Sequence, residues 1–294
     1  MTSPAPPLGR AQLWLQLLVI SALWGASFPL LRFAAGSMPP FALAAARGAI
    51  AALAIGAFLL WRGGGWHGRL AWWPILVAGT LNGWLPNVLT AVALTRVESA
   101  PAALIQSSTP LIVALLSLVA LREERPGPGM LAGLALGFCG IATIIGPQAW
   151  RADASAGGLL LMLAVSVSYA MGTIYIRRAR PPDATQLVLG QQMMAGAIAL
   201  ALSLAFDPPG AFEQPAEIWL VLVLLGVFAS AVPLSLFVLL LRRARATEAA
   251  MVGYLEPPFA ALLAGLWLAE IPEMRVLAGG MVVLAGVWLA TRRG

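Results

Sequence analysis

Two charged side chains sit deep inside long apolar stretches of this sequence and are the first candidates for chemistry. Arg47 stands seven residues into the stretch 40–61, and Glu256 stands nine residues into the stretch 247–269. If these stretches cross a membrane, each buried charge costs at least about 2.5–3.5 kcal/mol unless a partner or water compensates it. At a rise of 1.5 Å per residue both lie near mid-depth, roughly 11 and 14 Å from opposite ends. We expect an ion pair between them or a proton-coupling Glu256; a structural carboxylate beside Pro257 is the third interpretation.

Neutral polar groups and aromatic rings form a second set of candidates within the apolar stretches. Such groups avoid lipid and face the interior of a helix bundle, where they bind a ligand or hold helices together. The residues predicted to bind a substrate are Trp24, Asn82, Trp84, Asn87, Gln106, Ser107, Tyr169, Gln191, Ser230, Tyr254 and Glu256.

Prolines inside the apolar stretches are the candidate hinges, namely Pro86, Pro110, Pro233 and Pro257. A proline in a helix removes one backbone hydrogen bond and kinks the chain. At membrane depth the freed carbonyl is tolerated where it is buried in protein or faces a wet cavity. The prolines therefore predict kinks that frame a central cavity; kinks kept only for packing are the alternative.

Other chemistries are disfavoured by composition. His67 is the only histidine and Cys139 the only cysteine, so we expect no metal site, no cofactor and no catalytic triad. The apolar stretches hold no cluster of arginines that would grip a phosphate. A membrane enzyme would need several catalytic groups within the bilayer, and the only carboxylate there is Glu256.

The elements that must position these residues are transmembrane helices. The 294 residues are 60% hydrophobic and only 10% charged, with a mean hydropathy of +0.87, which no soluble domain could cover with polar surface. Runs of about 20 apolar residues span a bilayer. They occur at 11–32, 40–61, 70–94, 100–121, 128–147, 157–178, 184–206, 216–241, 247–269 and 273–291. The expected fold is an all-α integral membrane protein of ten helices, with lipid and no nucleic acid as its surroundings.

The arginines predict the orientation of these helices. All 18 cations are arginine, and alternating spans divide them 13 against 5 between the two sides. The side with more arginine faces the cytoplasm. Both termini are therefore expected there.

An internal repeat divides the chain. Shifting the sequence by 147 positions aligns residues 72–133 with 219–280 and gives 15 identities in 62 positions, including Pro86 with Pro233 and Pro110 with Pro257. Each half holds five predicted spans, so the second must enter the membrane from the opposite side. The halves are 1–150 and 151–294. Inverted repeats of this kind build many secondary transporters.

The repeated pattern resembles the drug/metabolite transporter superfamily. In this chain it reads Pro110…Glu123…Gly133 and Pro257…Glu270…Gly280, and Tyr254-Leu-Glu-Pro257 is the closest local match. The chain looks like the EamA-type ten-helix branch, which includes bacterial amino-acid exporters of the YddG kind. The resemblance implies export of small metabolites from the cytoplasm, across a bacterial inner membrane and without ATP hydrolysis.

The predicted cargo is a range of amino acids, neutral and aromatic ones included. A cavity with many amides and few fixed charges suits a zwitterion. Export of nucleosides or cationic drugs, a uniporter without ion coupling, and a channel are the alternatives. A monomer is expected, with a dimer through the glycines of the fifth and tenth spans as the other option.

Overall fold

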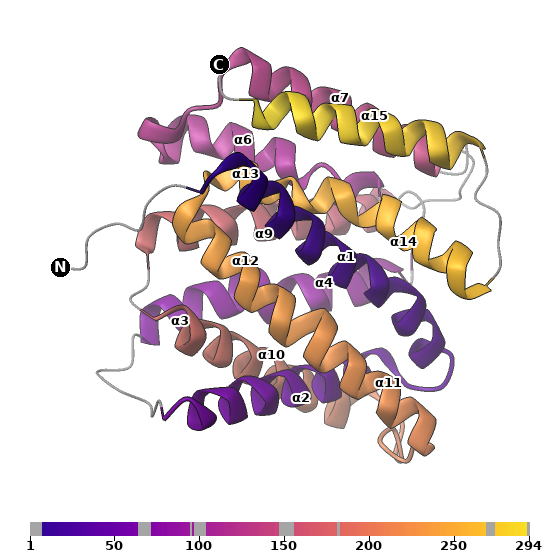
Figure 1. Ribbon diagram of the computed structural model, residues 1–294. Coiled ribbons are helices and arrows are strands. Elements are labelled where there is room, and N and C mark those ends of the chain that lie inside the picture. Colours follow the sequence, from indigo (N-terminus) through magenta and orange to yellow (C-terminus); the bar gives the residue numbers. More distant parts are fainter. Residues whose placement is uncertain are drawn as a thin grey trace.

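The described part of the chain is entirely helical. The computed structural model describes residues 8–63, 72–94, 96, 104–146, 156–180, 183–268 and 274–292, and no strand occurs within these ranges. Long helices run roughly side by side across the molecule (Figure 1). The all-α fold predicted from the sequence is therefore confirmed for these residues.

The helices occupy the predicted ranges, with ends that shift by a few residues. In the first half they are α1 (Arg10–Ala35), α2 (Pro40–Trp61), α3 (Trp72–Gly79), η1 (Thr80–Trp84), α4 (Leu85–Leu94), α6 (Thr109–Ala120), η2 (Arg122–Glu124) and α7 (Pro128–Ile145). In the second half they are α9 (Ala156–Ala179), α10 (Ala184–Phe206), α11 (Ala216–Gly226), η3 (Val227–Ala231), α12 (Val232–Arg243), α13 (Ala246–Ala250), α14 (Val252–Leu268) and α15 (Met274–Thr291).

Length and hydropathy make this a multi-pass membrane protein. Six helical segments of the described chain are long and apolar enough to cross a bilayer, and Leu104–Ala120 is a shorter apolar one. Large apolar side chains cover the outside, for example Trp61, Val119 and Leu204, which are 77–81% exposed. Exposure on this scale suits a surface in contact with lipid rather than water. The ten crossings and the cytoplasmic termini stay predictions.

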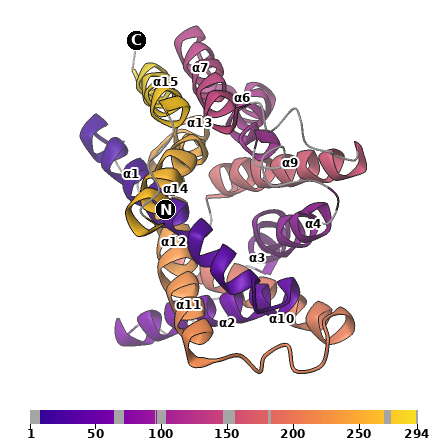
Figure 2. The same ribbon diagram turned by 90° about the vertical axis from the view of Figure 1, so that its right-hand side faces the viewer.

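Helices of the two halves pack against each other in matched pairs. Helix α7 packs on α15, and α2 packs on α10, so each of these helices contacts its own counterpart in the repeat. The remaining close pairs are reciprocal, since α1 packs on α14 as α9 packs on α6, and α11 packs on α2 as α3 packs on α10. Viewed along the helices, α1, α12 and α14 lie on one side and α4, α6 and α9 on the other (Figure 2).

Glycines set the close approach and show the direction of these pairs. A Cβ on Gly140 of α7 would lie 2.7 Å from the backbone N of Val283, and one on Gly279 of α15 would lie 2.7 Å from the carbonyl oxygen of Gly140. Gly133, earlier in α7, meets Gly286, later in α15. The two helices are therefore antiparallel, as expected for counterparts in an inverted repeat.

The interruptions of the helices fall at repeated positions. The π-helical turns Thr80–Trp84 and Val227–Ala231 are separated by the same 147 residues as the aligned sequences, and each comes just before a proline, Pro86 or Pro233. Pro110 lies at the start of α6, after a turn at residues 107–108. The helix α14 continues through Pro257 and Pro258. Three of the four candidate hinge prolines thus lie at breaks, and the fourth lies within a helix.

Candidate functional site

Arg47 is half-buried between the halves and is hydrogen-bonded to the broken helix of the second half. Its Nε donates to Ser230 Oγ at 2.6 Å, and its Nη2 donates to the carbonyl oxygen of Ala229 at 3.1 Å. Pro233 has no N–H, so the usual helical donor to the Ala229 carbonyl is missing. The guanidinium replaces that donor, and its hydrogen bonds offset part of the desolvation free energy of its own burial.

Tyr169 of α9 connects this arginine with the buried carboxylate. The side chain of Tyr169 is half-buried and lies within electrostatic range of both Arg47 and Glu256. We call Arg47, Tyr169, Ser230 and Glu256 the central polar group. Its members come from α2, α9, η3 and α14, so the group joins elements of both halves.

The expected ion pair between Arg47 and Glu256 is not formed. Within the described residues, the one salt bridge joins Arg177 to Glu124, and the bonds of Arg47 go to Ser230 and Ala229. In the same residues the Glu256 carboxylate has no hydrogen-bonding or ionic partner. Nη1 of Arg47 also has no partner among the described residues, and Tyr169 lies within electrostatic range of both charges.

Two further candidates lie on elements that border the central polar group. The side chain of Asn82 in η1 lies against Gly172 of α9, one turn beyond Tyr169 on the same helix face. Trp24 of α1 is half-buried and packs on Phe237 of α12, with ring centroids 5.5 Å apart. Both side chains are thus positioned by contacts between the halves.

Trp84 and Asn87 lie together at a different place. They line a shallow hollow of about 280 Å³, open mouth included, with Phe41 at the start of α2 and Ala195 of α10. The indole N–H of Trp84 donates to Thr80 Oγ1 at 3.2 Å. Asn87 is exposed. No member of the central polar group lines this hollow.

The remaining candidates are held in helix packing. Tyr254 is fully buried with its ring against Gly137 of α7, and within the described residues its hydroxyl has no partner. Residues two apart on a helix point in nearly opposite directions, so Tyr254 and Glu256 face different neighbours. Gln191 is fully buried and donates to the carbonyl oxygen of Ala78 at 3.1 Å. Gln106 and Ser107 stand at the turn before α6.

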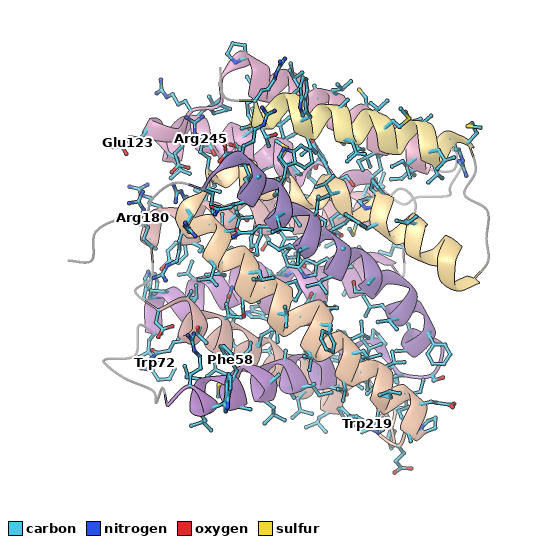
Figure 3. The ribbon with its side chains drawn as sticks, viewed as in Figure 1. Phe58, Trp72, Glu123, Arg180, Trp219 and Arg245 are labelled. Carbon is cyan, nitrogen blue, oxygen red and sulfur yellow. The ribbon has the colours of Figure 1, made fainter. Side chains whose placement is uncertain are left out.

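An ionic junction that the sequence did not single out lies at the arginine-rich end. Glu124 Oε1 accepts hydrogen bonds from Arg177 Nε at 2.7 Å and Nη2 at 2.6 Å, and Oε2 accepts one from the backbone N–H of Ala246 at 3.2 Å. Arg177 Nη1 also donates to the carbonyl oxygen of Leu241 at 2.8 Å. The junction ties η2 of the first half to α9, α12 and α13 of the second. Figure 3 shows Glu123, Arg180 and Arg245 at this end and Trp219 at the other.

Metal chemistry has no support in the described residues. No group of three or more His, Cys, Asp or Glu side chains is gathered there in a way that could hold a metal ion. His67, the only histidine, lies outside the described residues.

A multi-pass bundle whose broken helices surround a few interior polar groups is the architecture of a membrane transporter. Comparison with known families agrees with this class. The sequence model of the EamA-like transporter family matches residues 12–146 and again residues 156–292, and the chain belongs to that family, within the drug/metabolite transporter superfamily.

Individual relatives cover nearly the whole chain. The chain is 26% identical over 288 residues to the transporter YvbV of Bacillus subtilis, covering 98% of this chain and 93% of the relative. It is 25% identical over 276 residues to the inner membrane transporter YedA of Escherichia coli K12, covering 92% and 88%. A protein crystal structure of 21% sequence identity shares the fold, with a TM-score of 0.83 over 96% of this chain and 97% of that one.

Proposed function

We propose that this protein is a secondary-active exporter of small zwitterions, with amino acids of broad specificity as its main cargo. The observation that carries the proposal is the unpaired Glu256 carboxylate near the middle of a membrane helix, with Tyr169 within electrostatic range of both it and Arg47. One negative and one positive group, both within range of the same tyrosine, match the ammonium and carboxylate of an amino acid. In this arrangement Glu256 faces the ammonium and the free Nη1 of Arg47 faces the carboxylate.

Broad specificity follows from what surrounds these two charges. The neighbouring groups are aromatic rings and neutral polar side chains, such as Trp24 and Asn82, which accept side chains of different size without a charge requirement. Binding through the two groups common to all amino acids leaves the variable side chain in the less selective region.

Alternating access is proposed to arise from two inverted halves, 1–150 and 151–294. The antiparallel packing of α7 on α15, the repeated π-helical turns and the reciprocal helix pairs support this arrangement. Exchanging the conformations of two inverted halves converts an opening on one side into an opening on the other. The protein acts as a transporter without catalysing a covalent reaction, works as a monomer, and resides in a bacterial inner membrane with both termini in the cytoplasm.

A counterflow panel on proteoliposomes tests the cargo. Liposomes preloaded with one unlabelled amino acid are mixed with its labelled form and with competitors that each lack one recognised group. Amino acids of different side chains should compete, whereas amino-acid amides, which lack the carboxylate, and N-acetylated amino acids, which lack the ammonium, should not. Activity confined to sugars, nucleosides or cationic drugs would refute the proposal.

A second experiment separates coupled export from facilitated diffusion. We infer that protonation of Glu256 couples export to the proton gradient, because this carboxylate has no cation to hold it ionised among the described residues. Uptake is compared with and without a pH gradient in the wild type and in Glu256→Gln. Transport that ignores the gradient and survives the substitution favours a uniporter and overturns the coupling.

A further inference from the structure

The two π-helical turns each receive hydrogen bonds from a helix of the other half. In the first half, Gln191 Nε2 of α10 donates to the carbonyl oxygen of Ala78, and Ser168 Oγ of α9 donates to that of Leu81 at 2.8 Å. In the second half, Arg47 of α2 donates to the carbonyl oxygen of Ala229. Each half therefore completes the interrupted backbone of the other.

The bonds to Leu81 and Ala229 are needed because the turns and the prolines that follow them leave these two carbonyls without their usual backbone partners. The N–H of Leu85 is used by the carbonyl of Thr80, five residues earlier, and Pro86 has no N–H to offer the carbonyl of Leu81. A buried carbonyl without a donor costs on the order of a hydrogen bond or more, so the bond from Ser168 is required for the turn to persist. In the second half, Pro233 likewise has no N–H to offer the carbonyl of Ala229, and the hydrogen bond from Arg47 replaces it.

Arg47 and Gln191 hold equivalent places in the two halves. Gly226 is approached by Arg47 and by Ile50, one turn further along α2, while Gly79 is approached by Gln191 and by Met194, one turn further along α10. The two glycines are separated by the repeat distance of 147 residues. The two residues thus occupy matching packing positions, although their hydrogen bonds go to different carbonyls, that of Ala229 within η3 and that of Ala78 just before η1.

The two contacts differ in strength. Arg47 makes two bonds from a positively charged group, to a hydroxyl and to a carbonyl, and Ser230 is fixed in turn by donating to the carbonyl oxygen of Leu225 at 2.9 Å. Gln191 makes one neutral bond, and its Oε1 is buried without a partner among the described residues. Bonds from charged donors are roughly twice as strong as neutral ones. The bonds of Arg47 to η3 are therefore stronger than the bond of Gln191 to α3.

We infer that Arg47 and Gln191 are matched positioning residues that hold the broken helices across the interface between the halves. The tighter bond of Arg47 biases the protein toward the conformation described here. This inference rests on the proposed alternating access, because only a protein with a second conformation has an equilibrium to bias. A shift of that equilibrium requires a bond that differs between the two states.

Distances between spin labels at the two ends measure this equilibrium without any substrate. The background carries Cys139→Ser. One pair of labels joins Glu123 and Ala179 at the arginine-rich end, and a second joins Ser37 and Glu217 at the other end; all four positions are exposed and each pair spans the two halves. Pulsed electron paramagnetic resonance gives both distance distributions in proteoliposomes.

The substitution Arg47→Gln gives both halves a glutamine at this packing position. It should raise the population of a second conformation by about tenfold. The change should be reciprocal, with distances that increase at one end and decrease at the other. Ser230→Ala, which keeps the guanidinium and removes one acceptor, should shift both ends in the same sense by a smaller factor. The control is Ser235→Ala, whose hydroxyl bonds only the Ala231 carbonyl of its own helix, and it should match the wild type.

Equal broadening at both ends, or distributions of Arg47→Gln and Ser230→Ala that overlay the wild type, would overturn the inference. Neither result depends on the cargo. If the wild type exchanges amino acids but no reciprocal shift occurs, the inference fails and the proposed function stands. If the shift occurs and amino acids are not exchanged, the proposed cargo fails and the inference stands.

Discussion

The two halves of the chain share their backbone interruptions but carry different side chains beside them. At an offset of 147 residues, Ser230 corresponds to Gly83, and Glu256 corresponds to Thr109. At an offset of 145, Tyr169 corresponds to Trp24. The positions of prolines and π-helical turns are thus duplicated, while each ionisable group beside them occurs in a single copy.

Under the proposed transport function, this difference separates two requirements on the same scaffold. Movement of two inverted halves requires similar breaks in both, because each half must adopt the conformation of the other. Recognition of a ligand requires charges, and each charge inside a membrane is costly, so one copy is kept. Gly83 also departs from helical geometry, with φ −113° and ψ −106°, whereas Ser230 supplies a hydroxyl at the equivalent place. The four predictions that follow test this division, from the largest expected effect to the smallest.

Glu256→Gln should cause the largest loss. Removing the carboxylate that faces the ammonium should lower the initial rate of amino-acid exchange by about thirtyfold, as for the loss of a desolvated charge contact. Exchange in proteoliposomes measures it. The matched control is Glu217→Gln, an exposed carboxylate at the start of α11, which should leave the rate unchanged. Equal rates for the two variants would remove Glu256 from the site.

Glu124→Gln should mainly affect stability. At the offset of 147 residues, Glu124 corresponds to Ile271, which has no carboxylate. The repeat therefore does not supply a second copy of the Glu124 carboxylate that pairs with Arg177. Its loss should lower the free energy of unfolding by about 2 kcal/mol and the Tm by about 5 °C. Thermal unfolding in detergent measures the shift. Glu123→Gln, the exposed neighbour in η2, should stay within about 1 °C; an equal drop in both would contradict the role of the pair.

Tyr169→Phe and Trp24→Phe compare counterparts directly. Tyr169 lies within electrostatic range of both charges, so removal of its hydroxyl should slow exchange about fivefold. Trp24 packs against Phe237, and a phenyl ring preserves that contact, so the rate should change by less than about twofold. A larger effect at Trp24 than at Tyr169 would place the ligand contact on the first-half residue and the packing role on the second-half residue.

Ser21→Ala and Ser166→Ala should have the smallest effects and the most similar ones. Ser21 Oγ of α1 donates to the carbonyl oxygen of Val252, and Ser166 Oγ of α9 donates to that of Ile105, both at 3.1 Å. The two acceptors are 147 residues apart. Each substitution should cost about 1 kcal/mol in denaturant unfolding. Costs that differ by more than about 1 kcal/mol would break the equivalence of the halves at this contact.

Much of the fold was predictable because it depends on local composition. Apolar runs long enough to span a bilayer, proline positions and the 147-residue offset all appear in the printed sequence, and the helices and breaks follow them. The π-helical form of the breaks was not predictable. A proline removes a donor, but the chain forms a π-helical turn just before Pro86 and Pro233 and a continuous helix through Pro257, and the residue type does not distinguish the two outcomes.

The site was less predictable for a related reason. Arg47 and Glu256 were found because charges stand out in apolar sequence, but the partners of Arg47 include a backbone carbonyl, which no residue type identifies. Tyr254 is a candidate because it is a polar aromatic residue in the same apolar stretch as Glu256, but the helix turns the two side chains toward different surroundings. Glu124 stands in a short polar connection beside Glu123, and nothing in its type distinguishes the buried carboxylate from the exposed one.

The contact of α7 with α15 has a consequence for how such a chain arose. The close approaches of Gly133 to Gly286 and of Gly140 to Gly279 exchange with each other when the two helices are interchanged at an offset of 146 residues, one less than in the preceding part of the repeat, so the contact surface is complementary to itself. A self-complementary surface is what a two-fold symmetric homodimer uses. A single half inserted in both orientations would bury the same glycines against a second copy, and joining two such copies end to end would preserve the contact and allow the two sides to diverge.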